Sequence, residues 1–128
     1  MMLRFALLSA SLFAAACTAA PLVEPPAATP AAAGDACDLK VNFASIGTGI
    51  DSATLQKVDA LLSGDTGVST IDRQRWGKEG EIALCIDTKT TADTGRLFGA
   101  ITHVFPATSV KPISVETAAG QQFRVPTP

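Results

Sequence analysis

The residues best suited to chemistry in this chain are three cysteines and one histidine. Cys17, Cys37 and Cys85 lie far apart in the sequence, and His103 is the only histidine. A metal site built from such residues needs short spacings such as Cys-x-x-Cys or His-x-x-x-His, and the sequence has neither. A catalytic histidine needs a carboxylate or a nucleophile close by, and the sequence places none beside His103. We therefore predict no metal site, no cofactor and no catalytic residue from these side chains.

A glycine-containing segment, Gly47-Thr48-Gly49, follows the first expected strand, where a phosphate-binding loop would lie. It lacks the third glycine of a dinucleotide-binding loop and the Gly-Lys-Ser/Thr of a P-loop. We therefore interpret it as a turn. An enzyme that uses loop residues without a recognisable pattern stays an alternative.

The charge of the chain argues against nucleic-acid binding. Without Arg4, which precedes Cys17, nine Lys and Arg residues face twelve Asp and Glu residues, a net charge of −3. Binding to nucleic acids and to anionic lipids relies on clustered basic residues. Attachment to a membrane would therefore depend on a covalent lipid rather than on charge.

The start of the chain has the features of an export signal. Arg4 supplies a positive charge, residues 5–13 are mostly apolar, and Ala14-Ala15-Ala16 supplies small residues for cleavage. The apolar run is too short for a transmembrane helix, which needs about 20 residues. We therefore expect residues 1–16 to be removed as a signal peptide.

The end of this signal resembles the lipobox of bacterial lipoproteins. Ala15, Ala16 and Cys17 match the pattern, whereas Ala14 stands where the family usually has Leu, so ordinary cleavage at an Ala-x-Ala site is a second interpretation. The resemblance implies that Cys17 carries a diacylglyceryl group and palmitate. It also implies a lipid-anchored protein of the bacterial cell envelope that faces the periplasm. Thr18, in place of Asp after the cysteine, favours the outer membrane by the sorting rule of that family.

The segment 17–36 is rich in alanine and proline, which make up 12 of its 20 residues, and cannot build a core. Proline favours extended backbone, so we expect a semi-rigid tether of up to ~3 Å per residue. Two interpretations stay open, a spacer that lets the domain reach a partner and an export leader of no selected length.

Lipidation of Cys17 would leave an even pair, Cys37 and Cys85, in an oxidising compartment. We therefore expect these two to form a disulfide, with two buried free thiols as the alternative.

Hydrophobic periodicity predicts one small α+β domain over residues 37–128, with the element order β-α-β-β-α-β and a further C-terminal hairpin strand. This order is that of a two-layer ferredoxin-like sandwich, an antiparallel sheet of order 4-1-3-2 with both helices on one face. The order places Cys37 beside Cys85 if Cys37 lies just before the first strand or in a bulge. The expected strands are 39–43, 68–76, 81–87, 113–115 and 123–125, and the expected helices run from Asp51 or Ser52 to Gly64, which should be left-handed, and from Thr90 to Pro106.

The hairpin between the second and third strands decides which side chains lie on the open face of the sheet. A three-residue loop, Lys78-Glu79-Gly80, would place Trp76 on the buried face opposite Ile82, and Arg73 and Arg75 on the open face. We prefer this loop because loops of two or four residues would bury the arginines.

The candidate partner-binding residues are therefore Arg73, Arg75, Trp76 and Lys78. Guanidinium groups suit a carboxylate-bearing partner, either an envelope protein or a cell-wall peptide. The competing interpretation is that these charges only block aggregation of an edge strand.

The combination of lipid anchor, Ala/Pro tether and small domain resembles the peptidoglycan-associated lipoproteins of the OmpA-like class. Residues 50–62 are similar to the first helix of that family, but residues 87–96 do not match its peptide-binding motif, so no binding residue is carried over. BON-type envelope domains are similar in size and setting, but their glycine and valine pattern is not found in this sequence. The sequence therefore predicts a non-catalytic binding or structural role in the periplasm, with a peptidoglycan-associated module as an alternative.

Replacing Cys17 should remove the lipid, because its thiol is the acceptor of the diacylglyceryl group. Intact mass spectrometry of membrane-extracted protein should show that Cys17→Ser lacks a mass of that size. A native form that is water-soluble and cleaved one residue earlier or later would contradict lipidation.

Overall fold

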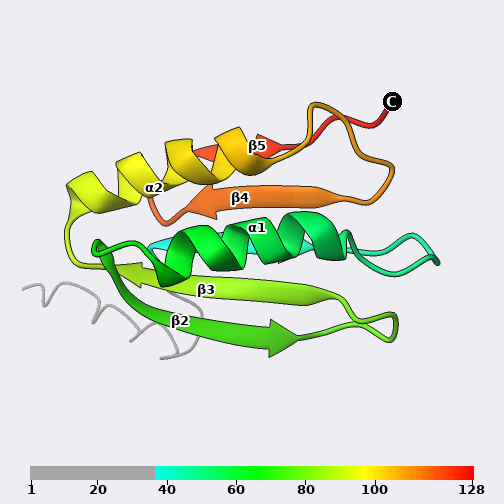
Figure 1. Cartoon of the computed structure of the whole chain (residues 1–128), viewed down its shortest axis with the longest axis horizontal. Helices are drawn as coiled ribbons and strands as arrows, with labels where there is room; N and C mark the ends of the chain where they lie inside the picture. Colours follow the sequence, from blue (N-terminus) through cyan, green and yellow to red (C-terminus); the bar gives the residue numbers. More distant parts are fainter. Residues whose placement is uncertain (1–36) are drawn as a thin grey trace, which may run out of the picture.

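Strand β1 lies at the centre of a five-stranded antiparallel sheet in the computed structural model, which describes residues 37–128. Both edges of β1 are paired, one with β3 and the other with β4, while β2 and β5 form the edges of the sheet (Figure 1). The order is therefore β2-β3-β1-β4-β5. The strands are β1 (Leu39–Phe43), β2 (Val68–Arg75), β3 (Ile82–Thr88), β4 (Ile113–Thr117) and β5 (Gln122–Arg124).

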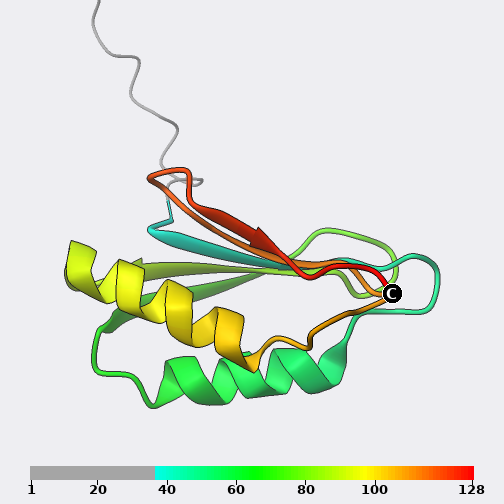
Figure 2. The same cartoon turned by 90° about the horizontal axis from the view of Figure 1, so that it is seen from above.

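Two helices, α1 (Ser52–Ser63) and α2 (Thr91–Val104), cover one face of this sheet and leave the other face open (Figure 2). The predicted α+β two-layer sandwich is confirmed. Strands β1 to β4 follow the expected order 4-1-3-2, but β5 extends the sheet beside β4, so the arrangement is not strictly ferredoxin-like. Within residues 37–128, neither helix has the length and apolar character to span a bilayer.

The signal peptide, the lipidation site at Cys17 and the tether that we predict for residues 1–36 lie outside the described residues. The structure therefore bears on the domain alone.

The core lies between the sheet and the helices. Strand β1 alternates buried and half-buried residues, as a strand with one covered face does. Burying one large aliphatic or aromatic side chain contributes roughly 1.5–3 kcal/mol, so this layer is the main source of stability. The buried residues of the core are Leu39, Val41, Phe43, Leu55, Val58, Leu62, Ile82, Leu84, Ile86, Leu97, Phe98, Ile101, Phe105, Ile113, Val115 and Val125.

Both helices begin at capping residues that the sequence marks. The Asp51 carboxylate accepts a hydrogen bond from the Thr54 backbone N–H at 3.0 Å, and the Thr90 hydroxyl accepts one from the Asp93 N–H at 3.1 Å. The expectation of a left-handed Gly64 is wrong, because its φ is −92°. Its N–H instead donates to the Leu62 carbonyl, which closes α1 with a tight right-handed turn.

Strand β5 is attached to the domain by more than its backbone pairing. Phe123 lies opposite Val115 on the side of the sheet that faces the helices, and its ring centroid is 6.2 Å from that of Phe105 at the end of α2. Val125 follows and is buried. The predicted hairpin strand is thus part of the fold.

Cys37 and Cys85 are at disulfide-bonding distance, with their Cα atoms 5.2 Å apart, as predicted. Cys37 lies just before β1, and Asp38 makes the turn that brings it to Cys85. The Asp38 carboxylate holds this turn by accepting hydrogen bonds from the Thr88 backbone N–H at 2.8 Å and from its hydroxyl at 3.0 Å. In a straight strand Cys37 would point to the same face as Leu39, whereas Cys85 points to the opposite face with Lys40. The turn at Asp38 lets the two cysteines meet.

Breaking this crosslink should destabilise the domain strongly, because it joins residues 48 positions apart. The loop-entropy relation gives about 4 kcal/mol for such a loop. We expect the double substitution Cys37→Ser/Cys85→Ser to lower the free energy of unfolding by about this amount in urea titrations. The wild-type protein under reducing conditions should behave like the variant, and equal stability of all three forms would show that the crosslink contributes nothing.

Candidate functional site

The open face of the sheet is formed by two rows of side chains that cross all five strands. Directly paired residues of neighbouring strands point to the same face, so the register defines the rows. The first row is Gln74, Ala83, Asn42, Ser114 and Arg124, and the second is Asp72, Cys85, Lys40, Glu116 and Gln122. With strands about 4.8 Å apart, each row extends over roughly 19 Å.

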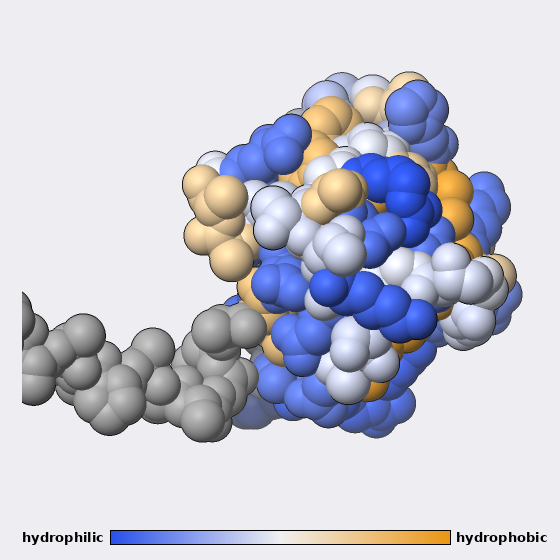
Figure 3. Space-filling view, turned by 90° about the vertical axis from the view of Figure 1, so that its left-hand side faces the viewer, coloured by the Kyte–Doolittle hydropathy of each residue, from blue (hydrophilic) through white to orange (hydrophobic). Residues whose placement is uncertain are grey.

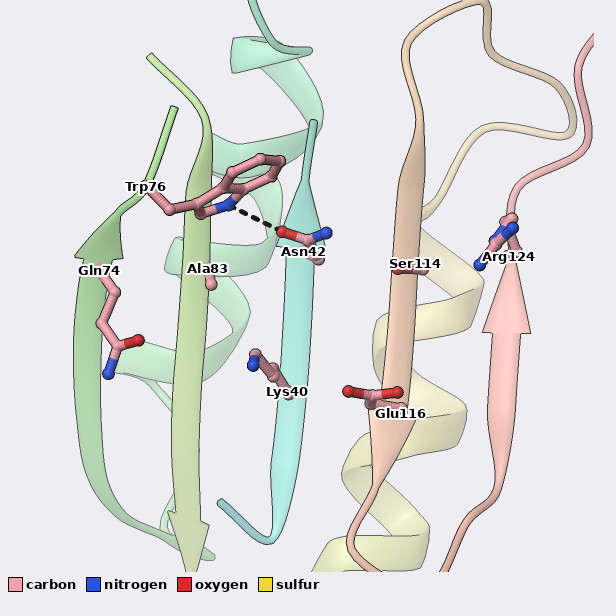
Figure 4. A pocket seen from close by; sticks show the side chains of 8 residues that line it. All are labelled: Lys40, Asn42, Gln74, Trp76, Ala83, Ser114, Glu116 and Arg124. Atoms are coloured by element: carbon pink, nitrogen blue, oxygen red, sulfur yellow. Dashed lines mark hydrogen bonds between the residues drawn. The ribbon is translucent and has the colours of Figure 1, made fainter. Parts of the chain in front are cut away.

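Between and beside these rows the face is hollowed into a groove of about 450 Å³, seen from the side away from the helices in Figure 4. Its lining is polar except for one indole ring and one methyl group. The lining residues are Lys40, Asn42, Gln74, Trp76, Ala83, Ser114, Glu116 and Arg124.

Trp76 is the largest side chain of this groove. It follows the last residue of β2, and its indole extends across β3 toward β1 (Figure 4). Its Nε1–H donates a hydrogen bond to the Asn42 Oδ1 at 3.0 Å, which holds the ring in place. The residue is nevertheless 55% exposed. Beside it Ala83, with only a methyl group, leaves the floor of the groove open.

Our predicted register for the hairpin before β3 is wrong. The Trp76 N–H donates to the Glu81 carbonyl and Arg75 lies opposite Ile82, so the loop has four residues, 77–80, and not three. Trp76 is therefore on the open face. Arg73 and Arg75 are on the face that the helices cover, together with the core residues of β3.

A loop of four residues would bury the arginines if the inward side of β2 lay beneath the helices. The loop does not bury them, because β2 is an edge strand whose inward side chains lie beside the helix layer and not beneath it. Arg73 and Arg75 are both exposed, and Arg73 forms an ion pair with Asp59 of α1. Lys78 is exposed in the loop and does not line the groove. Of the four predicted binding residues, only Trp76 contributes to it.

Two side-chain interactions support the hairpin. The Glu81 carboxylate folds back onto the loop and accepts a hydrogen bond from the Glu79 N–H at 2.9 Å, against the bare Cα of Gly77. The Ser45 hydroxyl donates to the Glu79 carboxylate, and so joins the loop after β1 to the hairpin.

Four lining residues are not among those predicted from the sequence, namely Gln74, Ser114, Glu116 and Arg124. The signal for two of them is present in the sequence, because Ser114 and Glu116 alternate with the buried Ile113 and Val115. Recognising them required the knowledge that β4 pairs directly with β1. Gln74 required the hairpin register.

Much of the hydrogen-bonding capacity in the groove is free for a ligand. Three residues that line the groove, Lys40, Ser114 and Arg124, make no side-chain hydrogen bond to another protein group within residues 37–128. Asn42 uses its carbonyl oxygen for Trp76, which leaves its amide NH₂ free. One Glu116 oxygen accepts from a Gln122 amide at 3.2 Å.

The groove has no evident reactive group. His103 is exposed on α2, in the layer behind the sheet, and its Nδ1 lies 2.7 Å from the Gly99 carbonyl. Among residues 37–128, no three His, Cys, Asp or Glu side chains come together to hold a metal ion. In the segment Gly47-Thr48-Gly49 both glycines have positive φ, which fits the interpreted turn. The arrangement of the groove is suited to binding.

A second polar cluster lies near the start of α2, at the end of the domain away from the β2–β3 hairpin. Arg96 of α2 makes two hydrogen bonds of 2.7 Å to the Asp65 carboxylate and one of 3.1 Å to Asp93. Hydrogen bonds from Arg96, and then from the Gly67 N–H, lower the pKa of Asp65 to about 2. Hydrogen bonds from Thr90 and Arg96 lower the pKa of Asp93. The cluster ties the loop before β2 to α2.

This end of the domain has a mostly hydrophilic surface, with hydrophobic side chains only in scattered areas (Figure 3). All charges of the cluster are paired with one another, so we assign it a structural role and keep the groove as the candidate site.

The chain matches no known family model, and no similar protein was found among curated proteins or solved structures. Its function must therefore be argued from the groove itself.

The Asp65 cluster should make stability depend on acidity. Because the pKa of Asp65 lies below the ordinary value of 3.8, its carboxylate stabilises the fold above about pH 4, and this contribution is lost as the pH falls toward about 2. We expect Asp65→Asn to lower the melting temperature at neutral pH, with the difference from wild type vanishing near pH 2.

The matched control is Asp59→Asn, which removes a carboxylate from an exposed ion pair with Arg73. Such exposed pairs contribute roughly 0–1 kcal/mol, so this control should change the melting temperature little at any pH. Equal effects of the two substitutions would contradict a special contribution of the cluster.

Proposed function

We propose that the protein is a lipid-anchored protein of the bacterial cell envelope whose domain binds the cell wall in the groove, without catalysis. The observation that carries this proposal is the exposed Trp76, held in position by Asn42 among polar side chains that have no internal partner. Holding a large aromatic side chain at the surface has a cost, since its burial would be favourable. A ligand that covers the ring would recover that free energy.

The size and polarity of the groove favour a small segment of ligand over the flat surface of a protein. Ligand pockets commonly enclose about 300–1,000 Å³, and this groove encloses about 450 Å³. The centres of protein–protein interfaces are rich in aromatic residues and poor in charge. Here one indole stands among Lys40, Glu116 and Arg124, which favours a polar partner.

The envelope location is supported by the lipobox resemblance at Cys17 and by the paired cysteines, which suit an oxidising compartment. Cys37, the first described residue, is bonded to Cys85, which stands opposite Lys40 on the open face. The described domain thus begins at a residue bonded to the strand that forms the floor of the groove, which suits a protein that links membrane and wall.

Binding to the cell wall can be measured by co-sedimentation with purified sacculi, using the Cys17→Ser protein so that no lipid contributes. Trp76→Ala should weaken binding roughly tenfold, because it removes the aromatic contact. Arg75→Ala is the matched control, since it changes the exposed residue just before Trp76, which points to the other face of the sheet.

Melting temperatures should stay close to that of the parent for both variants, because neither side chain belongs to the core. If Trp76→Ala sediments like the parent, the groove is not the binding surface. If no protein sediments with sacculi, the wall is not the ligand.

A further inference from the structure

We infer that the ligand of the groove is a saccharide, with one sugar ring stacked on the indole of Trp76 and its hydroxyls bound by the two side-chain rows. The inference rests on the proposed wall-binding function and names the part of the wall that the groove recognises, the glycan strand.

The indole of Trp76 offers a ligand its ring face and no hydrogen-bond donor. Its only hydrogen-bond donor, Nε1–H, is already used by the Asn42 Oδ1 at 3.0 Å. What Trp76 offers to a ligand is therefore the π face of a ring with a fixed orientation. That face carries a partial negative charge and attracts weakly positive C–H groups. A pyranose ring presents such C–H groups on one side and hydroxyls around its edge.

The polar side chains around Trp76 can bind the hydroxyls of a sugar. The row beside Trp76 offers the amide NH₂ of Asn42, the carbonyl oxygen of Gln74 and the hydroxyl of Ser114, and Lys40 adds a cationic donor and Glu116 an acceptor. Donors and acceptors are thus mixed across the face, and Lys40 and Glu116 stand directly opposite each other on neighbouring strands, which are ~4.8 Å apart. A chain of sugars, whose hydroxyls both donate and accept, can satisfy such a mixed set.

The charges of the open face argue against strongly charged ligands. The groove lining carries two cations, Lys40 and Arg124, and one anion, Glu116, while Asp72 of the second row lies outside the lining. With charges of both signs on it, the face does not favour polyanions or polycations. A quaternary ammonium ligand is bound by a cage of several aromatic rings, and this groove has one. A ligand without net charge fits this balance.

A peptide is the main competitor, and the sheet offers it little at this place. Extended peptides gain affinity by pairing their backbone with a free strand edge. The groove lies over the middle of the sheet, where β1 and β3 are paired on both sides. A wall peptide would have to bind through side chains alone, and its carboxylates would meet Glu116 as well as Lys40.

Trp76 allows a direct test because it is the only tryptophan of the chain. Oligomers of N-acetylglucosamine, titrated into the Cys17→Ser protein, should change its fluorescence in a saturable manner. The synthetic stem peptide of the wall should leave it unchanged. Saturation by the stem peptide and not by the oligosaccharide would overturn the inference.

Calorimetry with the same oligosaccharide separates the roles of the residues. Trp76→Ala should weaken binding roughly tenfold, and Trp76→Phe should recover part of the loss, because phenylalanine keeps a π face without the N–H. Asn42→Asp should retain more affinity than Asn42→Ala, since an acceptor for Nε1–H persists and the ring stays oriented. Arg75→Ala should bind like the parent.

The outcomes distinguish this inference from the proposed function. Binding to sacculi that depends on Trp76, together with no affinity for the oligosaccharide, would overturn the saccharide ligand and leave wall binding in place. Loss of both would overturn both. Equal affinity of Trp76→Ala and the parent for the oligosaccharide would show that the sugar binds elsewhere.

Discussion

The in-register pairing of β1 with both β3 and β4 is the constraint on which the rest of the domain depends. Because directly paired residues share a face, this pairing sends Leu39, Val41 and Phe43 into the core. It sends Lys40 and Asn42 to the open face, where they become the middle of the two rows. A shift of β1 by one residue would expose its three apolar side chains and bury a charge, so core and groove are specified by the same alternation.

Much of the fold can be predicted from the sequence because local rules and burial agree there. The strands around β1 alternate cleanly, Asp51 and Thr90 are suited to cap helices, and the element order leaves few topologies. The hairpin before β3 could not be predicted in this way. Its register depends on whether the inward side of β2 lies beneath a helix or beside it, and that is a property of the packed layers. Arg73 can face inward and stay exposed only because β2 is an edge.

The same error shows why the binding residues were mostly missed. A groove on a sheet collects residues from five strands, and neighbouring positions in it come from strands as far apart in sequence as β1 and β4. Trp76 was noticed for its chemistry, but its face depended on the loop of four residues. Once that loop is known, its partner follows from pairing, because Asn42 lies opposite Ala83, which is itself opposite Gln74.

The crosslink and the groove are connected through strand β3. Cys85 stands in the second row opposite Lys40, and the bond to Cys37 ties the point where the chain enters the domain to that row. The Asp38 carboxylate reinforces this by accepting two hydrogen bonds from Thr88, at the end of β3. A pull on the preceding segment would therefore act on β1 and β3, which are both paired on two sides, and not on an edge strand. Since Asn42 and Ala83 belong to these strands, the floor of the groove would keep its geometry while the domain is held by its N-terminal end.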